Sequence, residues 1–204
     1  MKFFKDHSYD IVKLFVNQIG IAIFSMAIFT AASIAIPQTS VWASRVDVAL
    51  SIASTAFYLV LIYMATWEIG AKDAISIEYG KMEKMPLKGT LMGLFANVPN
   101  FLITGLAIVF MSITVFGGPE WGKNVFAVFT LFFTFLESMF MGVVTNLFPI
   151  TEGSPDAAVN ATYLCRAILY FVAPLISIAT TTFGYLMGSN NKRIFPKAQT
   201  KKPE

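Results

Sequence analysis

The feature that most constrains this chain is a series of long apolar runs. They cover residues 11–36, 48–67, 89–116, 124–148 and 163–187. A helix of about 20 residues crosses the ~30 Å hydrocarbon core of a bilayer, and each run reaches that length. A helix also satisfies all of its own backbone polar groups, which lipid cannot do. The runs therefore predict helices embedded in a membrane.

The composition agrees with a bilayer setting. Of 204 residues, 56% are hydrophobic and 13% are charged, whereas about a quarter of a soluble domain is charged. So few charges cannot cover the surface of a soluble protein of this size. We therefore expect an all-α, polytopic integral membrane protein, with one helical membrane domain over residues 1–190. Residues 191–204 read as a basic, disordered cytoplasmic tail.

Several chemistries have no support in the sequence. His7 is the one histidine and Cys165 the one cysteine, so the chain cannot build a His/Cys metal site or an internal disulfide. It has no glycine-rich phosphate loop, no G-x-S-x-G and no H-E-x-x-H. The basic tail has no interleaved aromatic residues that would favour nucleic acid. We expect no metal and no cofactor. A non-enzymatic role is favoured, and an intramembrane enzyme using Glu137 stays open.

The basic residues predict an orientation. They gather in the N-terminal stretch, in the loop at 67–89 and in the tail, and only Arg45, Lys123 and Arg166 lie elsewhere. The positive-inside rule places those three segments in the cytoplasm, for a multi-pass protein of the cell inner (plasma) membrane.

That orientation needs an even number of crossings, and there are five apolar runs. The weakest is 124–148, which carries Glu137 at mid-depth and Gly142 soon after. We expect four transmembrane helices plus one re-entrant or interfacial segment packed against protein. The alternative is five full spans with the tail outside.

Glu137 is the first candidate site residue. A carboxyl in the middle of an apolar run marks a possible cation or proton site, because it is expensive to hold charged there. The alternatives are a protonated glutamate bonded to a neighbouring helix, or a glutamate at a re-entrant bend near water. Arg166 begins the last run and is the plausible basic partner, so we predict a Glu137–Arg166 pair as a hypothesis.

The second candidate site is the segment Asn97-Val98-Pro99-Asn100. Pro99 removes one helical hydrogen bond and is expected to break or kink the helix. The freed carbonyl and the amides of Asn97 and Asn100 could bind a cation or polar ligand, as broken helices of transporters do. The alternative is a kink whose loose groups Asn97 and Asn100 satisfy.

The charged interval from 67 to 100 is the third candidate. It has mixed signs, which suits a solvated helix or a surface that docks a partner, with Lys72, Asp73, Lys81 and Lys84 as the docking candidates. An ordinary solvated connector is the alternative. Gly89/Gly93 and Gly184/Gly188 have the G-x-x-x-G spacing that permits close helix packing.

Three stretches carry a resemblance to known proteins, at residues 70–81, 88–101 and 174–188. They contain G-x-K-D, Y-G-K, A-N-x-P-N and G-Y-x-x-G. Their order and spacing resemble a group of small, uncharacterised multi-spanning membrane proteins of Gram-positive bacteria. The chain departs from that pattern after Asp73, where Ala74-Ile75 stand in place of Arg-Asn. The resemblance implies a bacterial inner membrane and no particular activity.

Two functions follow from these features. The first is a non-enzymatic subunit or accessory of a membrane assembly, because the chain is small and its spans hold few polar groups. The alternative is a small oligomeric transporter or channel for an ion or small solute, using Glu137 and the Asn97–Asn100 segment. The expected partners are the lipid bilayer and either further copies of this chain or a larger membrane complex.

Overall fold

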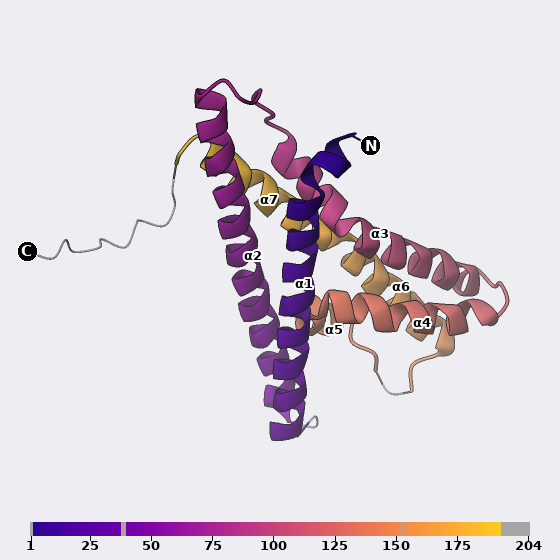
Figure 1. Cartoon of the computed structure of the whole chain (residues 1–204). Helices are drawn as coiled ribbons and strands as arrows, with labels where there is room; N and C mark the ends of the chain where they lie inside the picture. Colours follow the sequence, from indigo (N-terminus) through magenta and orange to yellow (C-terminus); the bar gives the residue numbers. More distant parts are fainter. Residues whose placement is uncertain (1, 38–39, 152, 193–204) are drawn as a thin grey trace, which may run out of the picture.

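The computed structural model describes residues 2–37, 40–151 and 153–192, and the regular elements of these residues are helices throughout (Figure 1). The predicted disordered tail lies, apart from its first two residues, outside the described residues. The elements are α1 (Lys2–Ala35), α2 (Val41–Glu78), α3 (Lys88–Val115), α4 (Trp121–Leu136), the short 3₁₀ helix η1 (Ser138–Phe140), α5 (Met141–Leu147), α6 (Asp156–Val172) and α7 (Pro174–Ser189).

Four stretches of helix are long and apolar enough to cross a bilayer. They are α1, α2, α3 and the succession of α6 and α7, which together cover Asp156–Ser189. The fourth apolar run instead forms a pair, α4 and η1–α5, that bends by 86°. The 16 residues of α4 are about 24 Å long, short of the ~30 Å core. The predicted fold class, a polytopic helical membrane protein with four spans and one irregular segment, is confirmed.

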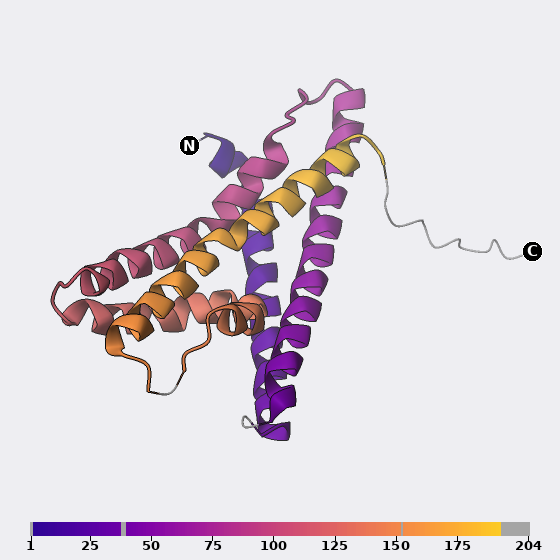
Figure 2. The ribbon, with the colours of Figure 1, turned by 180° about the vertical axis from the view of Figure 1, so that it is seen from behind.

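The helices outline a triangle. α1 and α2 lie side by side along one edge, α6–α7 and α3 run diagonally along the second, and α4 closes the third (Figures 1 and 2). α7 packs along both α2 and α3, and the α4–η1–α5 pair ends against α1 and α2. The start of α1, the turn between α2 and α3, and the end of α7 all lie at one end of the molecule.

Helix α2 is longer than the sequence predicts. Ser40 caps its start by accepting a 3.2 Å hydrogen bond from the Trp42 amide, and the helix runs on to Glu78, just before Gly80 with φ of +67°. Such a φ favours glycine and ends a helix. The boundary expected at Trp67 is therefore wrong, because charged residues such as Lys72 continue a helix that nothing interrupts before Gly80.

Helix α3 continues through Pro99 without interruption. A break of the helix at Pro99 is therefore wrong, whereas a kink there stays a prediction. Proline removes one hydrogen bond, and neighbouring groups in a packed membrane helix can satisfy the freed backbone. The helices instead break elsewhere. α1 has non-helical angles at His7, α4 ends at Glu137, and α6 gives way to α7 at Ala173.

The interior falls into three buried clusters. One, including Met111, Phe133 and Tyr170, joins α3, α4, α5 and α6. A second joins α1, α2, α3 and α7, and the third packs Tyr58 of α2 against Met139 of η1. The bent pair therefore packs against the long helices, as irregular backbone at membrane depth requires.

Helices α2 and α7 approach so closely that glycine is needed between them. A β-carbon on Gly188 would collide with the Trp67 carbonyl and would lie 3.0 Å from the amide nitrogen of Ala71. One turn earlier, a β-carbon on Gly184 would lie 2.9 Å from the carbonyl oxygen of Tyr63. Close packing at this G-x-x-x-G pair is confirmed.

The other G-x-x-x-G pair lies between α3 and α7. A β-carbon on Gly89 would come within 2.9 Å of the Thr181 carbonyl oxygen, and one on Gly93 would collide with the Thr181 hydroxyl. Close packing is confirmed here too. α7 is therefore held between α2 and α3 with almost no space on either side.

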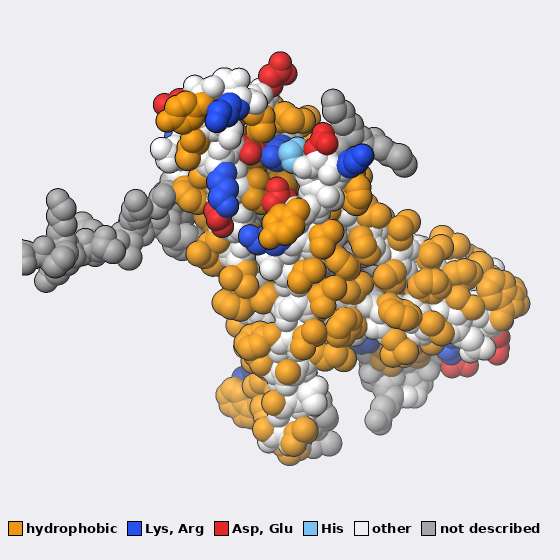
Figure 3. All heavy atoms as spheres, in the orientation of Figure 1, with side chains coloured by type: hydrophobic (Ala, Val, Ile, Leu, Met, Phe, Trp, Pro, Cys, Tyr) orange, Lys and Arg blue, Asp and Glu red, His pale blue; other side chains and the backbone are white. Residues whose placement is uncertain are grey.

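The surface separates into two zones. Hydrophobic side chains cover most of the body of the molecule, as expected of a face that meets lipid. Many of the charged side chains gather at the end that holds the α2–α3 turn (Figure 3). This division agrees with a protein whose charged end projects from the bilayer.

Candidate functional site

Glu137 lies at the bend of the irregular segment. It follows the last residue of α4, its amide donates to the Phe133 carbonyl at 2.9 Å, and η1 begins at the next residue. The residue is 1% exposed, and neither carboxyl oxygen has a hydrogen-bond partner among the described residues. A buried carboxyl without a partner is strongly unfavourable when charged. This is the most unusual polar group in the described part of the chain.

The surroundings of Glu137 come from several helices. Its carboxyl is within electrostatic range of the hydroxyls of Tyr58 on α2 and Tyr170 on α6. The next residue, Ser138, donates a 2.8 Å hydrogen bond to the Ala22 carbonyl of α1. The Ser138 hydrogen bond fixes the bend against α1, and Ser51 of α2 donates a 2.6 Å hydrogen bond to the Met139 carbonyl of η1.

Arg166 does not pair with Glu137. Its Nε donates to the Phe148 carbonyl at 2.9 Å, and its Nη2 reaches the Thr145 carbonyl at 3.4 Å. These carbonyls stand at the end of α5, where helix carbonyls lack partners within the helix. The predicted Glu137–Arg166 pair is therefore wrong, because the guanidinium is used by the helix end.

Asn97 and Asn100 belong to a buried hydrogen-bond chain. Asn100 donates to the Asn97 carbonyl oxygen at 3.1 Å, and Asn97 donates both to the Gly93 carbonyl at 2.8 Å and to the Ser177 hydroxyl at 3.3 Å. Ser177 in turn shares a 3.2 Å hydrogen bond with the hydroxyl of Tyr58. The chain thus runs from α3 through α7 to α2.

Three buried side-chain oxygens of α3 have no hydrogen-bond partner among the described residues. One is Oγ1 of Thr114, near the end of the helix, and the other two lie nearer its middle. These two are Oδ1 of Asn100 and Oγ1 of Thr104, and both residues are 0% exposed. Because they are four residues apart on one helix, their side chains share a face. α3 therefore presents two unpartnered acceptors on its buried side, next to the chain that leads to Tyr58.

The structure thus connects some of the predicted site residues and leaves others apart. Asn97 and Asn100 are linked through Ser177 to Tyr58, whereas Arg166 bonds carbonyls at the end of α5. Tyr58 is within electrostatic range of Glu137 but does not hydrogen-bond it. Sequence reasoning missed Tyr58 and Ser177. The signal that could have found them is a polar side chain inside an apolar run, since such groups commonly bond across membrane helices.

A small cavity lies beside the bend on the α1 side. It has a volume of about 200 Å³, and α1, α4, η1 and α5 form its wall. Four hydroxyl groups line it, from Thr30, Ser33, Thr134 and Ser138. A water molecule occupies about 30 Å³ of liquid, so this polar cavity can hold several. Ser138 and Thr134 flank Glu137 along the chain.

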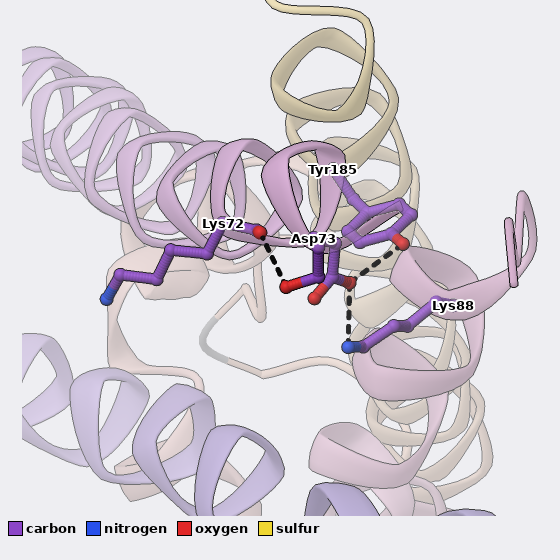
Figure 4. Close-up of polar contacts among 5 residues, drawn as sticks. Lys72, Asp73, Lys88 and Tyr185 are labelled. Atoms are coloured by element: carbon purple, nitrogen blue, oxygen red, sulfur yellow. Dashed lines mark hydrogen bonds and ion pairs between the residues drawn. The ribbon is translucent and has the colours of Figure 1, made fainter. Parts of the chain in front are cut away.

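A second polar cluster stands at the charged end of the molecule. Lys88 Nζ lies 2.7 Å from Oδ2 of Asp73, and the Tyr185 hydroxyl donates to the same oxygen at 2.9 Å (Figure 4). The two charged side chains are only 4% and 13% exposed. The cluster ties α2, α3 and α7 together above their glycine contacts.

This geometry divides the predicted docking residues. Asp73 points inward to Lys88 and Tyr185, whereas the side chain of Lys72 points away from them (Figure 4). The Lys72 ammonium pairs with Glu68 at 2.8 Å. Lys81 and Lys84 are exposed in the turn that follows α2. The inward position of Asp73 argues against it as a docking contact. Lys72, Lys81 and Lys84 remain exposed to a partner.

The segments that carry the family resemblance contact one another. Gly70 of the first stretch would collide with the Tyr185 carbonyl of the third if it bore a β-carbon, and Lys88 of the second bonds Asp73 of the first. No protein-family model, curated protein or solved structure matches the chain. The resemblance stays a prediction.

Proposed function

We propose that this chain is a membrane transport protein for a small cation and that Glu137 binds the cation. One observation carries the proposal: a fully buried carboxyl, with both oxygens free of hydrogen bonds to the described residues, at the bend of a broken helix segment. Intramembrane carboxyls of this kind mark ion and proton pathways. Broken helices at membrane depth build such sites in transporters.

The energetics favour a ligand for this carboxyl. A lone buried charge is several kcal/mol less stable than the same charge in water, by order of magnitude, and a bound cation would remove most of that penalty. If Glu137 had only a structural role, an apolar side chain would fill the same position without this penalty. The buried acceptors of Asn100 and Thr104, and the hydroxyl of Tyr58, add polar surface in the same interior.

We also propose that the protein lies in the bacterial inner membrane with the start of α1 and the α2–α3 turn in the cytoplasm. The positive-inside rule supports this orientation, because the basic residues of those segments share one end of the molecule. In this arrangement α4 and α5 enter and leave the membrane on its outer side. The four spans, α1, α2, α3 and α6–α7, then bring the end of α7 back to the cytoplasm.

Ion uptake into proteoliposomes tests the transport function. Purified protein is reconstituted, and uptake of H⁺, Na⁺ and Rb⁺ is followed for the wild type, for Glu137→Gln and for the control Thr180→Val. Thr180 is exposed on α7 and its hydroxyl bonds only its own helix, at Ile176. We expect at least one cation to enter with the wild type and the control, and none above the lipid background with Glu137→Gln. Equal rates for all three proteins, or no uptake at all, would refute the proposal.

A role as a subunit of a membrane assembly is the second candidate. The observation that favours it is the free end of α2, which carries Lys72, the exposed side chain of Ile75 and Tyr79 at 73% exposure. Exposed apolar and aromatic groups beside charges suit a partner's surface. Crosslinking from a photoreactive group at Tyr79 in native membranes tests it. A specific adduct that charge reversal of Lys81 and Lys84 removes would support docking, and the absence of any adduct would exclude it at this surface.

A further inference from the structure

We infer that the cation bound at Glu137 is a proton, exchanged with the hydroxyls of Tyr58 and Ser177 on one side and with the hydroxyl-lined cavity beside Ser138 on the other. This inference rests on the proposed transport function. The transport function requires only a small cation, whereas the inference specifies a proton and the groups through which it moves.

The number of ligands favours a proton over a metal ion. Calcium and magnesium take six or more oxygen ligands, several of them carboxylates. Glu137 is the only buried acid among the described residues, and no group of three or more His, Cys, Asp or Glu side chains in them could hold a metal. A proton needs one carboxyl oxygen and no cage, and it neutralises the buried charge completely.

The hydroxyls of Tyr58 and Ser177 provide one side of the path. Either of these two groups can be the donor in their 3.2 Å hydrogen bond, which is the property that a reversible relay requires. The Tyr58 hydroxyl does not hydrogen-bond the carboxyl in this structure, so the proposed step requires it to move into reach. Tyr58 then gives its hydroxyl hydrogen to the Glu137 carboxylate and takes another from Ser177, and Ser177 takes one from water. O–H bonds alone are made and broken, so no redox partner is needed. Asn97 holds the Ser177 oxygen in place by donating to it at 3.3 Å.

This side of the path leads toward the charged end of the molecule. Ser177, Thr181 and Tyr185 lie four residues apart on α7, are each buried, and share one helix face. The face ends at the Tyr185 hydroxyl, which donates to Asp73 at 2.9 Å. From Ser177 to Tyr185 is about 12 Å along the helix. Thr181 lies between them and its hydroxyl donates to the Ile178 carbonyl at 2.8 Å, so the proposed path needs water molecules to cross this interval.

The other side of the path is the cavity of about 200 Å³ beside the bend. Its hydroxyls from Thr30 and Ser33 lie on the last two turns of α1, toward the opposite end of the molecule from Asp73. Ser138 brings the cavity next to Glu137 in the chain. Glu137 is not itself in the cavity wall, so in the proposed path the cavity connects to the carboxyl through the neighbouring Ser138 and Thr134.

Few other ionisable groups face this carboxyl. They are Tyr58 from α2 and Tyr170 from α6, with Arg166 acting on Tyr170 from the same helix. Ser25 of α1 and Asn100 and Thr104 of α3 are buried, with oxygens that have no hydrogen-bond partner among the described residues, and these side chains do not titrate. Glu137 is thus the one group here that can change its charge by taking up a proton.

Proteoliposomes containing a pH-sensitive dye test the inference. A potassium gradient with valinomycin drives cations inward, and internal acidification is followed in H₂O and D₂O. Glu137→Gln should abolish proton entry. Tyr58→Phe and Ser177→Ala should each slow it by about tenfold, the effect of losing one buried hydrogen bond in the relay. Tyr163→Phe, which removes a tyrosine hydroxyl outside the chain of bonds, should keep the wild-type rate, and D₂O should slow the wild type.

The outcomes separate the two proposals. Glu137-dependent entry of Na⁺ or Rb⁺ without acidification overturns the proton assignment and leaves the transport function standing. Acidification that Tyr58→Phe and Ser177→Ala leave unchanged overturns the path. No movement of any ion overturns both. Gel filtration in detergent checks that each variant folds. If either Tyr58→Phe or Ser177→Ala fails to fold, the other variant alone tests the path.

Discussion

One fully buried and one partly buried acid show opposite ways of keeping a carboxyl inside this protein. Asp73 receives a lysine ammonium and a tyrosine hydroxyl, whereas Glu137 receives no hydrogen bond from the described residues. Removing one partner of a buried ion pair leaves an uncompensated charge, while removing a lone buried carboxyl relieves one. Substitutions at the two sites should therefore change stability in opposite directions.

We predict that Glu137→Leu stabilises the protein. The apolar side chain removes a buried group without partners, so the free energy of unfolding should rise by about 1–3 kcal/mol. Thermal unfolding in detergent measures it, with Thr180→Val as the control that should leave stability nearly unchanged. A lower unfolding temperature for Glu137→Leu would mean that the carboxyl is bonded in the folded state.

We predict that Lys88→Met and Asp73→Asn each destabilise the protein by about 3 kcal/mol, because each leaves the other charge buried without its partner. The double variant should lose much less than the sum of the two. Denaturant unfolding of the four proteins gives the coupling energy as a double-mutant cycle. Strictly additive losses would show that the pair does not interact.

At the scale of the helices, the stability depends on how closely α7 approaches its neighbours. Gly184 and Gly188 face α2, and Gly89 and Gly93 of α3 face α7, each where a β-carbon would meet a neighbouring helix. Without a hydrophobic force between helices in lipid, such close van der Waals packing holds them together. The Asp73 cluster then fixes the same three helices at their charged end.

We predict that Gly188→Ala loosens the contact between α2 and α7. The added methyl would overlap the Trp67 carbonyl, and overpacking of this kind costs about 1–3 kcal/mol. Gly20→Ala is the matched control, since a β-carbon there has no atom within 4 Å and alanine favours a helix by up to about 1 kcal/mol. Unfolding midpoints in detergent should fall for the first and stay or rise for the second.

At the scale of the whole molecule, the orientation that we propose rests on where the charged residues and the helix ends lie. The four spans leave the α2–α3 turn at one end and the loop between α5 and α6 away from it (Figures 1 and 2). The bent pair resolves the mismatch between five apolar runs and an even number of crossings, because neither α4 nor α5 is long enough to cross alone.

We predict that the two loops lie on opposite sides of the membrane. In a Cys165→Ala background, an impermeant maleimide should label Glu83→Cys only from the cytoplasmic side and Ser154→Cys only from the outer side. Inverted and right-side-out vesicles provide the two sides. Labelling of both positions from the same side would contradict the four-span arrangement.

Much of the fold could be predicted because the bilayer imposes simple rules on the chain. Apolar length predicts spans, and Glu137 with Gly142 marks the run that bends. The errors arise where context overrides local signals. α2 passes Trp67 because Gly70 packs against α7, and α3 passes Pro99 because packed neighbours can satisfy the freed backbone. The predicted pair of Glu137 and Arg166 is wrong because the Arg166 guanidinium instead donates to carbonyls at the end of α5.

The sequence by itself determined that this is a helical membrane protein with one irregular segment, because hydrophobic length and charge act along the chain. The tertiary structure alone decided which polar groups meet. It joined Asn97 to Tyr58 through Ser177, turned Asp73 inward to Lys88, and left Glu137 without a hydrogen bond from the described residues. Such contacts join residues as many as 119 positions apart, and their formation depends on how the helices pack.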